Sequence, residues 1–454
     1  MIDAFGSQHA VDHPVAGQAF AAAVGALAGH RPDAGAHLEA ALEAEPALTA
    51  AHALAGMAAI VLAGKDHLAD AAIRLQRSRA ALGRNGGGTA FERALVAALE
   101  HAVAGRLRAA ADGLDDFLYR DPNAFLAAKL SHALRFMTGD VDGMVSLTAR
   151  LSLECERSNA GYGYLLGCHA FGLEEIGRLH EAERVGRAAL AIAADDAWGL
   201  HAVAHVFESR GQTAEGTAWL EEHRAVWTRC NNFSRHFAWH LALFALERGD
   251  HDAVMAIYDR DVASELSGDF RDFANAASML WRLRQLGIDP GAARWEVLAD
   301  IARRHARSTT LVFAQMHFLI ALIGSGARDE AAAFAEFIHD SGRAATDQAN
   351  VARNVGAELA FALVHGDRGG ASDVPVGFLA RRLHRLGGSH AQRDVFLQAL
   401  AGMAHAAGDA AGLRQVLAVR RRHKADDPSV TKLLRGANSA SAHVPAELRG
   451  GDGQ

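Results

Sequence analysis

Residues 177–182, GRLHEA, and residues 326–331, GARDEA, are the stretches that decide the fold. In each, a glycine ends an apolar helical stretch, and a Glu-Ala pair follows four and five residues later, inside the next helix. A helix that stops and reverses direction needs at its end a residue that tolerates positive φ, which is the common role of glycine at a helix C-terminus. The two stretches therefore predict helical hairpins.

The same turn recurs along the chain at intervals of 34 to 42 residues. This period, the Glu-Ala pair, and a proline 17 residues after two of the glycines resemble tetratricopeptide repeats, which end their second helix at such a proline. One hairpin cannot bury its apolar stripe alone, so neighbouring hairpins must stack. We therefore predict an all-α fold in which tetratricopeptide-like helical hairpins stack in an α-solenoid. The turn glycines are Gly29, Gly64, Gly105, Gly139, Gly177, Gly211, Gly249, Gly287, Gly326, Gly366 and Gly408, and the two prolines are Pro46 and Pro122.

The pattern predicts one array and one tail. Residues 1–425 are expected to form a single array of about eleven hairpins, and residues 426–454, which are rich in small and polar residues, a flexible tail. The chain has only 8 prolines in 454 residues, and Ala and Leu dominate it, which favours long helices over strands. The alternative is an irregular helical bundle, and the repeat pattern is weakest at Gly105 and Gly287.

Charge and cysteine content exclude several classes of function. The chain has 46 basic and 53 acidic residues, a net charge of −7, and no basic face of the kind that nucleic-acid-binding domains present. Its 3 cysteines fit a reducing compartment. We find neither a secretory signal nor an apolar segment long enough to span a membrane. We expect a cytoplasmic protein without nucleic-acid or membrane partners.

The histidines are the most informative residues for function, because two neighbouring repeats each carry an HxxxH pair. In DAWGLHAVAHVFESR, His201, His205 and Glu208 occupy positions i, i+4 and i+7 and share one helical face. In FSRHFAWHLALFALERG, His236 and His240 repeat the spacing. In tetratricopeptide repeats the first helix of each hairpin lines the concave surface, and first helices of consecutive repeats pack about 8–10 Å apart. One ion or small molecule could therefore contact both pairs.

HxxxH on a helix is the spacing with which two imidazoles bind one divalent metal ion such as zinc. We predict His201, His205, His236 and His240 as metal ligands. His201, His205 and Glu208 are the predicted catalytic residues, with Glu208 as a further ligand or as the general base for a metal-bound water. Without metal, the imidazoles and the carboxylate could still perform acid–base chemistry. A separation above about 8 Å between the His201 and His236 imidazoles would exclude a shared site.

The alternative for each pair is that the histidines are hydrogen-bonded packing residues between helices. That interpretation is favoured for His132, His317 and Glu358, whose offsets from their turn glycines match hairpin packing. The motif GGSHAQRDVF at residues 387–396 predicts a helix capped by Ser389, with an Arg-Asp pair in its first turn. Further pocket candidates are His169, Trp198, Trp239, Arg393 and Asp394.

The order of several segments resembles the tetratricopeptide repeat protein 38 family over roughly residues 45–425. HAVAHVFE and GGSHAQRDVF carry the resemblance most specifically. It implies a cytosolic helical-repeat protein with no attributable activity, and it maps the family's HxxxHxxE and HxxxH segments onto the two histidine pairs named above. The family has Asn where this chain has His390, which implies that His390 is dispensable.

These patterns predict a His- and Glu-lined concave pocket that belongs to a metal-dependent or imidazole acid–base enzyme, a hydrolase or a lyase, acting on a small polar molecule. No nucleotide cofactor is expected, because a strand followed by a phosphate-binding loop is missing. The alternative is a non-catalytic scaffold that binds a peptide or protein partner in its concave groove. A purely structural protein, with singly hydrogen-bonded histidines, is the third class.

Overall fold

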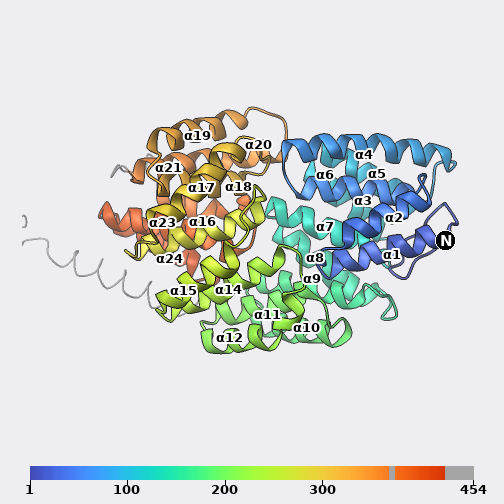
Figure 1. The fold of residues 1–454 in the computed structure, drawn as a ribbon, viewed down its shortest axis with the longest axis horizontal. Helices are drawn as coiled ribbons and strands as arrows, with labels where there is room; N and C mark the ends of the chain where they lie inside the picture. Colours follow the sequence, from blue (N-terminus) through green and yellow to red (C-terminus); the bar gives the residue numbers. More distant parts are fainter. Residues whose placement is uncertain (368–373, 425–454) are drawn as a thin grey trace, which may run out of the picture.

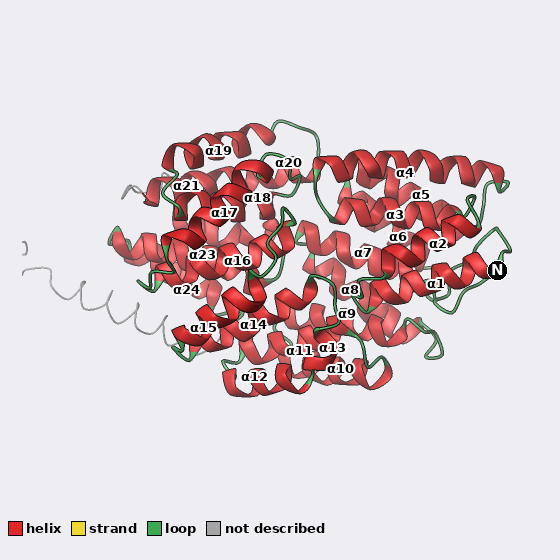
Figure 2. Cartoon of the chain, in the orientation of Figure 1, coloured by secondary structure: helices red, strands yellow, loops and turns green. Residues whose placement is uncertain are grey.

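The computed structural model describes residues 1–367 and 374–424. Within these residues the chain consists of helices joined by turns, with two isolated β-bridges, Ile2 to Gln8 and Gly64 to Thr309, and no strand (Figure 2). The predicted all-α fold is confirmed. The predicted flexible tail, residues 426–454, lies outside the described residues.

The helices follow one another in antiparallel pairs, as the repeat pattern predicts (Figure 1). From α7 to α18, the first helix of each pair is buried over most of its length, whereas the second helix exposes one face. The first helices therefore form the inner layer that carries the histidine pairs. They are α1 (Pro14–Ala28), α3 (Thr49–Val61), α5 (Ala90–Val103), α7 (Phe125–Thr138), α9 (Tyr162–Glu175), α11 (Ala197–Ser209), α14 (Phe233–Glu247), α16 (Phe270–Gln285), α18 (Val312–Gly324), α21 (Ala357–Asp367) and α23 (His390–Ala406).

The second helices form the outer layer. They are α2 (Ala34–Ala44), α4 (Lys65–Arg84), α6 (Leu107–Leu118), α8 (Val141–Glu154), α10 (Leu179–Ile192), α12 (Thr213–Glu222), α15 (His251–Ile257), α17 (Ala292–His305), α19 (Arg328–Ser341), α22 (Val376–Arg382) and α24 (Ala410–Arg420). Short helices complete the connections: α13 (Arg224–Trp227), α20 (Asp347–Val351), the π-helices η1 (Tyr258–Val262) and η2 (Ala352–Gly356), and the 3-10 helix η3 (Leu383–Leu386).

Most predicted turn glycines lie where a helix ends, and the Gly-Asp turns explain how the next helix begins. Gly139 closes α7 at φ 66°, and the side chain of Asp140 then accepts a hydrogen bond from the Gly143 N–H in the first turn of α8. Glycine provides the left-handed conformation and aspartate the N-cap, so two adjacent residues reverse the chain.

Three of the predicted turn glycines behave differently. Gly29 and Gly64 have negative φ, and the neighbouring His30 and Ala63 take the left-handed conformation instead, at φ 55° and 53°. Gly366 lies inside α21, which continues to Asp367, so the prediction that it ends the helix is wrong.

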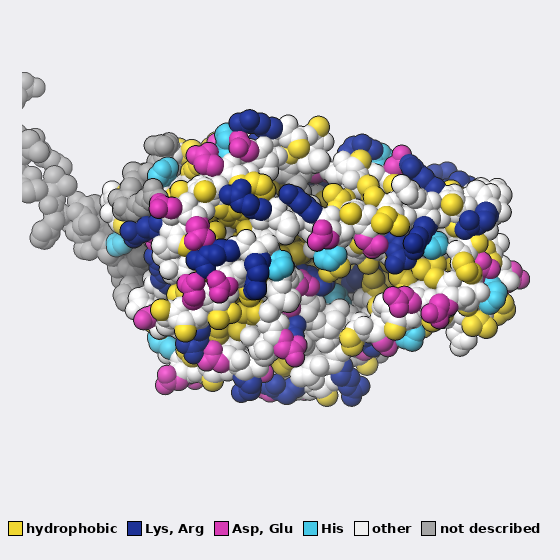
Figure 3. Space-filling view, turned by 45° about the horizontal axis from the view of Figure 1, so that its top comes forward, with side chains coloured by type: hydrophobic (Ala, Val, Ile, Leu, Met, Phe, Trp, Pro, Cys, Tyr) yellow, Lys and Arg dark blue, Asp and Glu magenta, His cyan; other side chains and the backbone are white. Residues whose placement is uncertain are grey.

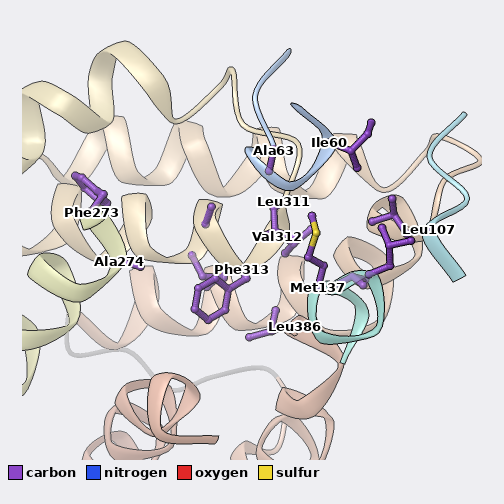
Figure 4. Packing of buried hydrophobic residues seen from close by; sticks show 14 of the residues in the cluster. Ile60, Ala63, Leu107, Met137, Phe273, Ala274, Leu311, Val312, Phe313 and Leu386 are labelled. Atoms are coloured by element: carbon purple, nitrogen blue, oxygen red, sulfur yellow. The ribbon is translucent and has the colours of Figure 1, made fainter. Parts of the chain in front are cut away.

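The two halves of the array contact each other. Thr310 N–H donates to the Ala63 carbonyl at 2.7 Å, and Asp347 N–H donates to the Gly105 carbonyl at 3.0 Å. Figure 4 shows Ile60 and Ala63 beside Leu311 and Val312, which belong to one buried cluster. Because early repeats pack against late ones, the inner helices enclose a shared interior instead of an open groove.

On the face drawn in Figure 3, acidic and basic side chains are interspersed with one another, without a broad region of one sign. No helix in the described part of the chain combines the length and the apolar character needed to cross a membrane.

Candidate metal centre and adjoining cavity

Three buried histidines from adjacent inner helices converge on one point. His201 from α11 lies with its Nε2 2.9 Å from the Nε2 of His236 and 3.1 Å from the Nε2 of His240, both on α14. The Nε2 atoms of His236 and His240 are 3.3 Å apart. We call these three residues the histidine triad. The two HxxxH pairs therefore share one space, and the separation that would have excluded a common site does not occur.

These distances match those between the ligands of one small divalent ion. Nitrogen ligands about 2.0–2.1 Å from a tetrahedral zinc ion are about 3.3 Å from one another. The three edges of the triad, 2.9, 3.1 and 3.3 Å, are at or slightly below this value. His201, His236 and His240 would therefore be the residues that hold such an ion.

The outward-facing nitrogens of two rings are held by hydrogen bonds. His236 Nδ1 lies 2.9 Å from Asn275 Oδ1 on α16, and His240 Nδ1 lies 3.0 Å from Glu208 Oε2 on α11. Both partners are acceptors, so each Nδ1 carries the proton and each Nε2 presents a lone pair to the shared space. A single proton on His201 Nε2 can form one straight hydrogen bond, whereas one divalent ion accepts all three lone pairs.

Electrostatics keep the triad neutral. Burial lowers the pKa of His201 and of His236 well below the ordinary value, and neighbouring imidazoles lower both further. For His240, burial also dominates and lowers the pKa to about 4, although the Glu208 hydrogen bond opposes it. Neutral imidazole is the form that binds metals.

Glu208 acts on the far side of the His240 ring. Burial opposes its ionisation, but the hydrogen bond from His240 and the charge of Lys424 outweigh burial and lower its pKa to about 2. The carboxylate is therefore ionised and orients His240 from behind. The sequence predicted Glu208 as a metal ligand or general base. Either role would require the carboxylate to face the shared space, whereas it contacts the opposite side of the His240 ring.

His205 lies beside the triad. It offers a ring nitrogen within 4.8 Å of the ligand atoms of the triad. Neither of its ring nitrogens has a hydrogen-bond partner among the described residues. Its Nδ1 is 3.4 Å from Glu174 Oε2, which connects it to a second cluster.

The second cluster joins the end of α9 to the start of α23. His390 Nε2 lies 2.7 Å from Glu174 Oε1, and the backbone N–H of His390 donates to Glu175 Oε1 at 2.8 Å. Arg393 Nη2 donates to Glu175 Oε2 at 3.1 Å. Burial opposes protonation of His390, but the charges of Glu174 and Glu175 outweigh it and raise its pKa to about 9. The charges of these buried groups are balanced by ion pairs. Because the carboxylates lie on α9 and their partners on α23, the cluster connects distant repeats.

A cavity of about 200 Å³ adjoins the triad. His201 and His236 contribute to its wall, and so does Asn275. The rest of the wall is mainly aromatic and basic: Phe136, Trp198, Phe233, Phe270, Phe313, His30, His132, Lys129 and Arg271. None of the described residues lining this cavity is an aspartate or a glutamate.

Some polar atoms of the wall have no protein partner. The indole Nε1 of Trp198 and both ring nitrogens of His132 are buried without a hydrogen-bond partner in the described part of the chain. Burial, with a smaller effect of Lys129, lowers the pKa of His132 to about 3. Because His132 lines the cavity, the expectation that it is only a hairpin packing residue does not hold.

The other predicted pocket residues fall into two groups. Trp198 lines the cavity, and Trp239 stacks on His236 with ring centroids 5.1 Å apart while donating its Nε1–H to Ser278. The remaining three lie away from the triad: His169 is hydrogen-bonded to Thr148, Arg393 belongs to the second cluster, and Asp394 pairs with Arg420.

Sequence reasoning missed Asn275 and Lys129. Neither belongs to a motif, and each comes from a different repeat than the two HxxxH pairs. Their offsets before the turn glycines, 12 before Gly287 and 10 before Gly139, place both on inner helices. Offset 10 belongs to the set used for His201, so that signal could have found Lys129.

No family model matches the chain. The resemblance to the tetratricopeptide repeat protein 38 family therefore stays a prediction.

Proposed function

We propose that the protein is a metal-dependent enzyme, a hydrolase or a lyase, in which His201, His236 and His240 hold one divalent ion of the zinc type. The observation that carries the proposal is the convergence of three Nε2 atoms within 3.3 Å, two of them on rings whose Nδ1 is bound by an acceptor. Three protein ligands leave the fourth position of a tetrahedral ion open, which distinguishes catalytic from structural zinc sites.

The adjoining cavity supports a reaction on a small molecule. A bound divalent ion would polarise a carbonyl or phosphoryl oxygen, or lower the pKa of a water molecule. Asn275 and Glu208 hold the ligand rings in place. His205, with its ring centroid 4.3 Å from that of His201 and its Nδ1 3.4 Å from Glu174 Oε2, is the residue placed to accept or return a proton.

Elemental analysis by plasma mass spectrometry tests the metal site. We expect about one zinc per chain in the parent protein after reconstitution and dialysis. His236→Ala and His240→Ala should lose the metal, whereas His205→Ala should keep most of it. His169→Gln is the matched control, because His169 lies outside the triad and should leave the metal content unchanged. Circular dichroism verifies that each variant folds.

The catalytic part of the proposal needs a second measurement. The zinc-loaded parent and His236→Ala are assayed against a panel of small esters, amides and phosphoesters. Turnover in the parent that His236→Ala abolishes supports the enzyme. A parent that takes up no metal overturns the metal site. Stoichiometric metal without turnover in any assay, together with unfolding on metal removal, favours a structural site instead.

A further inference from the structure

Lys129 is a buried cation at the wall of the cavity. Its side chain projects from α7, and the residue is only 8% exposed. Its only hydrogen bond to a described residue goes to a weak acceptor, the Cys168 sulfur, 3.8 Å from Nζ. No carboxylate among the described residues lies within ion-pair distance of its ammonium group. Burying an ammonium group without a counter-charge is costly.

One buried carboxylate acts on Lys129 from beyond ion-pair distance. Asp196, the N-cap residue of α11, is fully buried and interacts electrostatically with Lys129 without approaching within ion-pair distance. Burial raises the pKa of Asp196 to about 7, although Lys129 opposes this. Near neutral pH the aspartate therefore carries only part of a charge. Arg271, the other cation of the wall, is different because it already pairs with Asp269 at 2.5 Å.

A second donor of the same wall also lacks a partner. Lys129 Nζ lies 5.2 Å from the centre of the Trp198 ring, and the indole Nε1–H of Trp198 is buried and unpartnered among the described residues. An ammonium group and an indole N–H can both donate to the oxygens of one anionic group.

The remaining wall suits an apolar body of limited size. Trp198 stacks on Phe233 with ring centroids 5.6 Å apart, and Phe136 meets Trp198 edge-on at 5.8 Å. An apolar cavity of about 150 Å³ accepts a benzene molecule, so the cavity of about 200 Å³ has room for one ring and a small polar group.

From these observations we infer that the cavity binds a small organic anion, with its carboxylate or similar oxyanion on Lys129 and Trp198 and its ring-sized apolar part against the aromatic wall. The inference names the substrate class of the proposed enzyme and in that sense rests on the proposed function. The binding contacts themselves come from Lys129 and the aromatic residues, so they exist whether or not the triad holds a metal.

Isothermal titration calorimetry with benzoate tests the inference, and benzamide serves as the uncharged probe of the same shape. Both are titrated into the full chain after chelator treatment and again after zinc loading. We expect benzoate to bind the metal-free protein and benzamide to bind at least tenfold more weakly. Lys129→Met keeps the length of the side chain and removes the charge, and should weaken benzoate binding at least tenfold while leaving benzamide unchanged.

Two further variants keep the test decisive. Lys65→Met removes an exposed lysine and should leave benzoate binding as in the parent. Lys129→Arg retains the charge and should bind benzoate better than Lys129→Met, which separates charge from packing if Lys129→Met folds poorly. Equal affinity for benzoate and benzamide, equal benzoate affinity of the parent and Lys129→Met, or no benzoate binding overturns the inference.

The metal measurement and the anion measurement fail independently. Lys129-dependent benzoate binding in a chain that takes up no zinc leaves the anion site standing and overturns the metal-dependent enzyme. Zinc held by the triad without Lys129-dependent benzoate binding leaves the metal site standing and overturns the anion site.

Discussion

At the scale of single residues, the ring nitrogens of the triad have two roles. Those that face the shared space can bind a metal, and those that face away from it form hydrogen bonds that orient the rings. His236 and His240 each turn one nitrogen inward and bind an acceptor with the other. The acceptors fix the tautomer and the ring orientation, which raises the affinity of a metal site without adding a ligand.

Asn275 provides the first prediction. Asn275→Ala removes the acceptor of His236 Nδ1–H and frees the ring to rotate, so we expect the zinc affinity to fall about 10- to 100-fold. Competition with a chromophoric chelator measures it. Asn232→Ala is the matched control, because Asn232 also lines the cavity but binds Asp269 instead of a histidine. Equal zinc affinities of the two variants would contradict the role of Asn275.

Glu208 provides the second prediction, because its position separates orientation from direct catalysis. Glu208→Gln keeps an oxygen that can accept from His240 Nδ1–H but removes the negative charge, so zinc affinity should fall about tenfold. The same competition with a chromophoric chelator measures this zinc affinity. If zinc affinity is unchanged while turnover is lost, Glu208 is a general base, as the sequence pattern allowed, and its contact with His240 is incidental.

At the scale of elements, the left-handed glycines of the turns differ in what surrounds them. Gly139 and Gly211 have nearly the same φ, 66° and 68°. A Cβ on Gly211 would meet nothing within 4 Å, whereas a Cβ on Gly139 would lie 2.0 Å from the backbone oxygen of His384. Gly139 is thus a turn residue and also the place where η3 rests on the end of α7.

This pair of glycines gives the third prediction. Gly211→Ala should lower the free energy of unfolding by about 1 kcal/mol, the cost of a left-handed alanine. Gly139→Ala carries the same cost and must also displace the backbone at His384, which should add about 1–3 kcal/mol. Urea unfolding followed by circular dichroism measures both. Equal losses of unfolding free energy would show that the backbone of η3 moves away from a Cβ at residue 139 without a measurable loss of stability.

At the scale of the whole molecule, the contacts between early and late repeats turn a stack of hairpins into an enclosed structure. In an open solenoid each repeat contacts only its neighbours. Here Glu174 and Glu175 on α9 hold His390 and Arg393 on α23, more than 200 residues later. Residues of early and late repeats line the cavity together, among them His132 on α7 and Gln392 on α23.

The closure gives the fourth prediction, on pH. The folded-state pKa of His390 is about 9, above its ordinary value of 6.5. The protonated histidine therefore contributes its full stability below about pH 6.5, and the contribution is lost as the pH rises through about 9. It amounts to about 3 kcal/mol at most. Urea unfolding at about pH 6 and about pH 9.5 should show a larger loss for the parent than for His390→Asn, whose side chain does not titrate. Equal losses would contradict this role.

The sequence by itself determined the class of fold, and it predicted two histidine pairs on neighbouring inner helices that one ion could contact. Glycine conformation and helical periodicity are local properties, so the glycines of GRLHEA and GARDEA ended their helices as predicted, and the spacing of His201, His236 and His240 on inner helices brought them together. Locally ambiguous turns were less reliable, as Gly366 inside α21 shows.

Only the tertiary structure decided which groups surround the triad. Asn275 reaches His236 from the next repeat, and Lys129 reaches the cavity from two repeats earlier, because inner helices converge on one interior. The direction of Glu208, behind His240 instead of into the shared space, depends on the rotation of α11 against α14. Contacts over such sequence distances are set by the closure of the array, which no local pattern encodes.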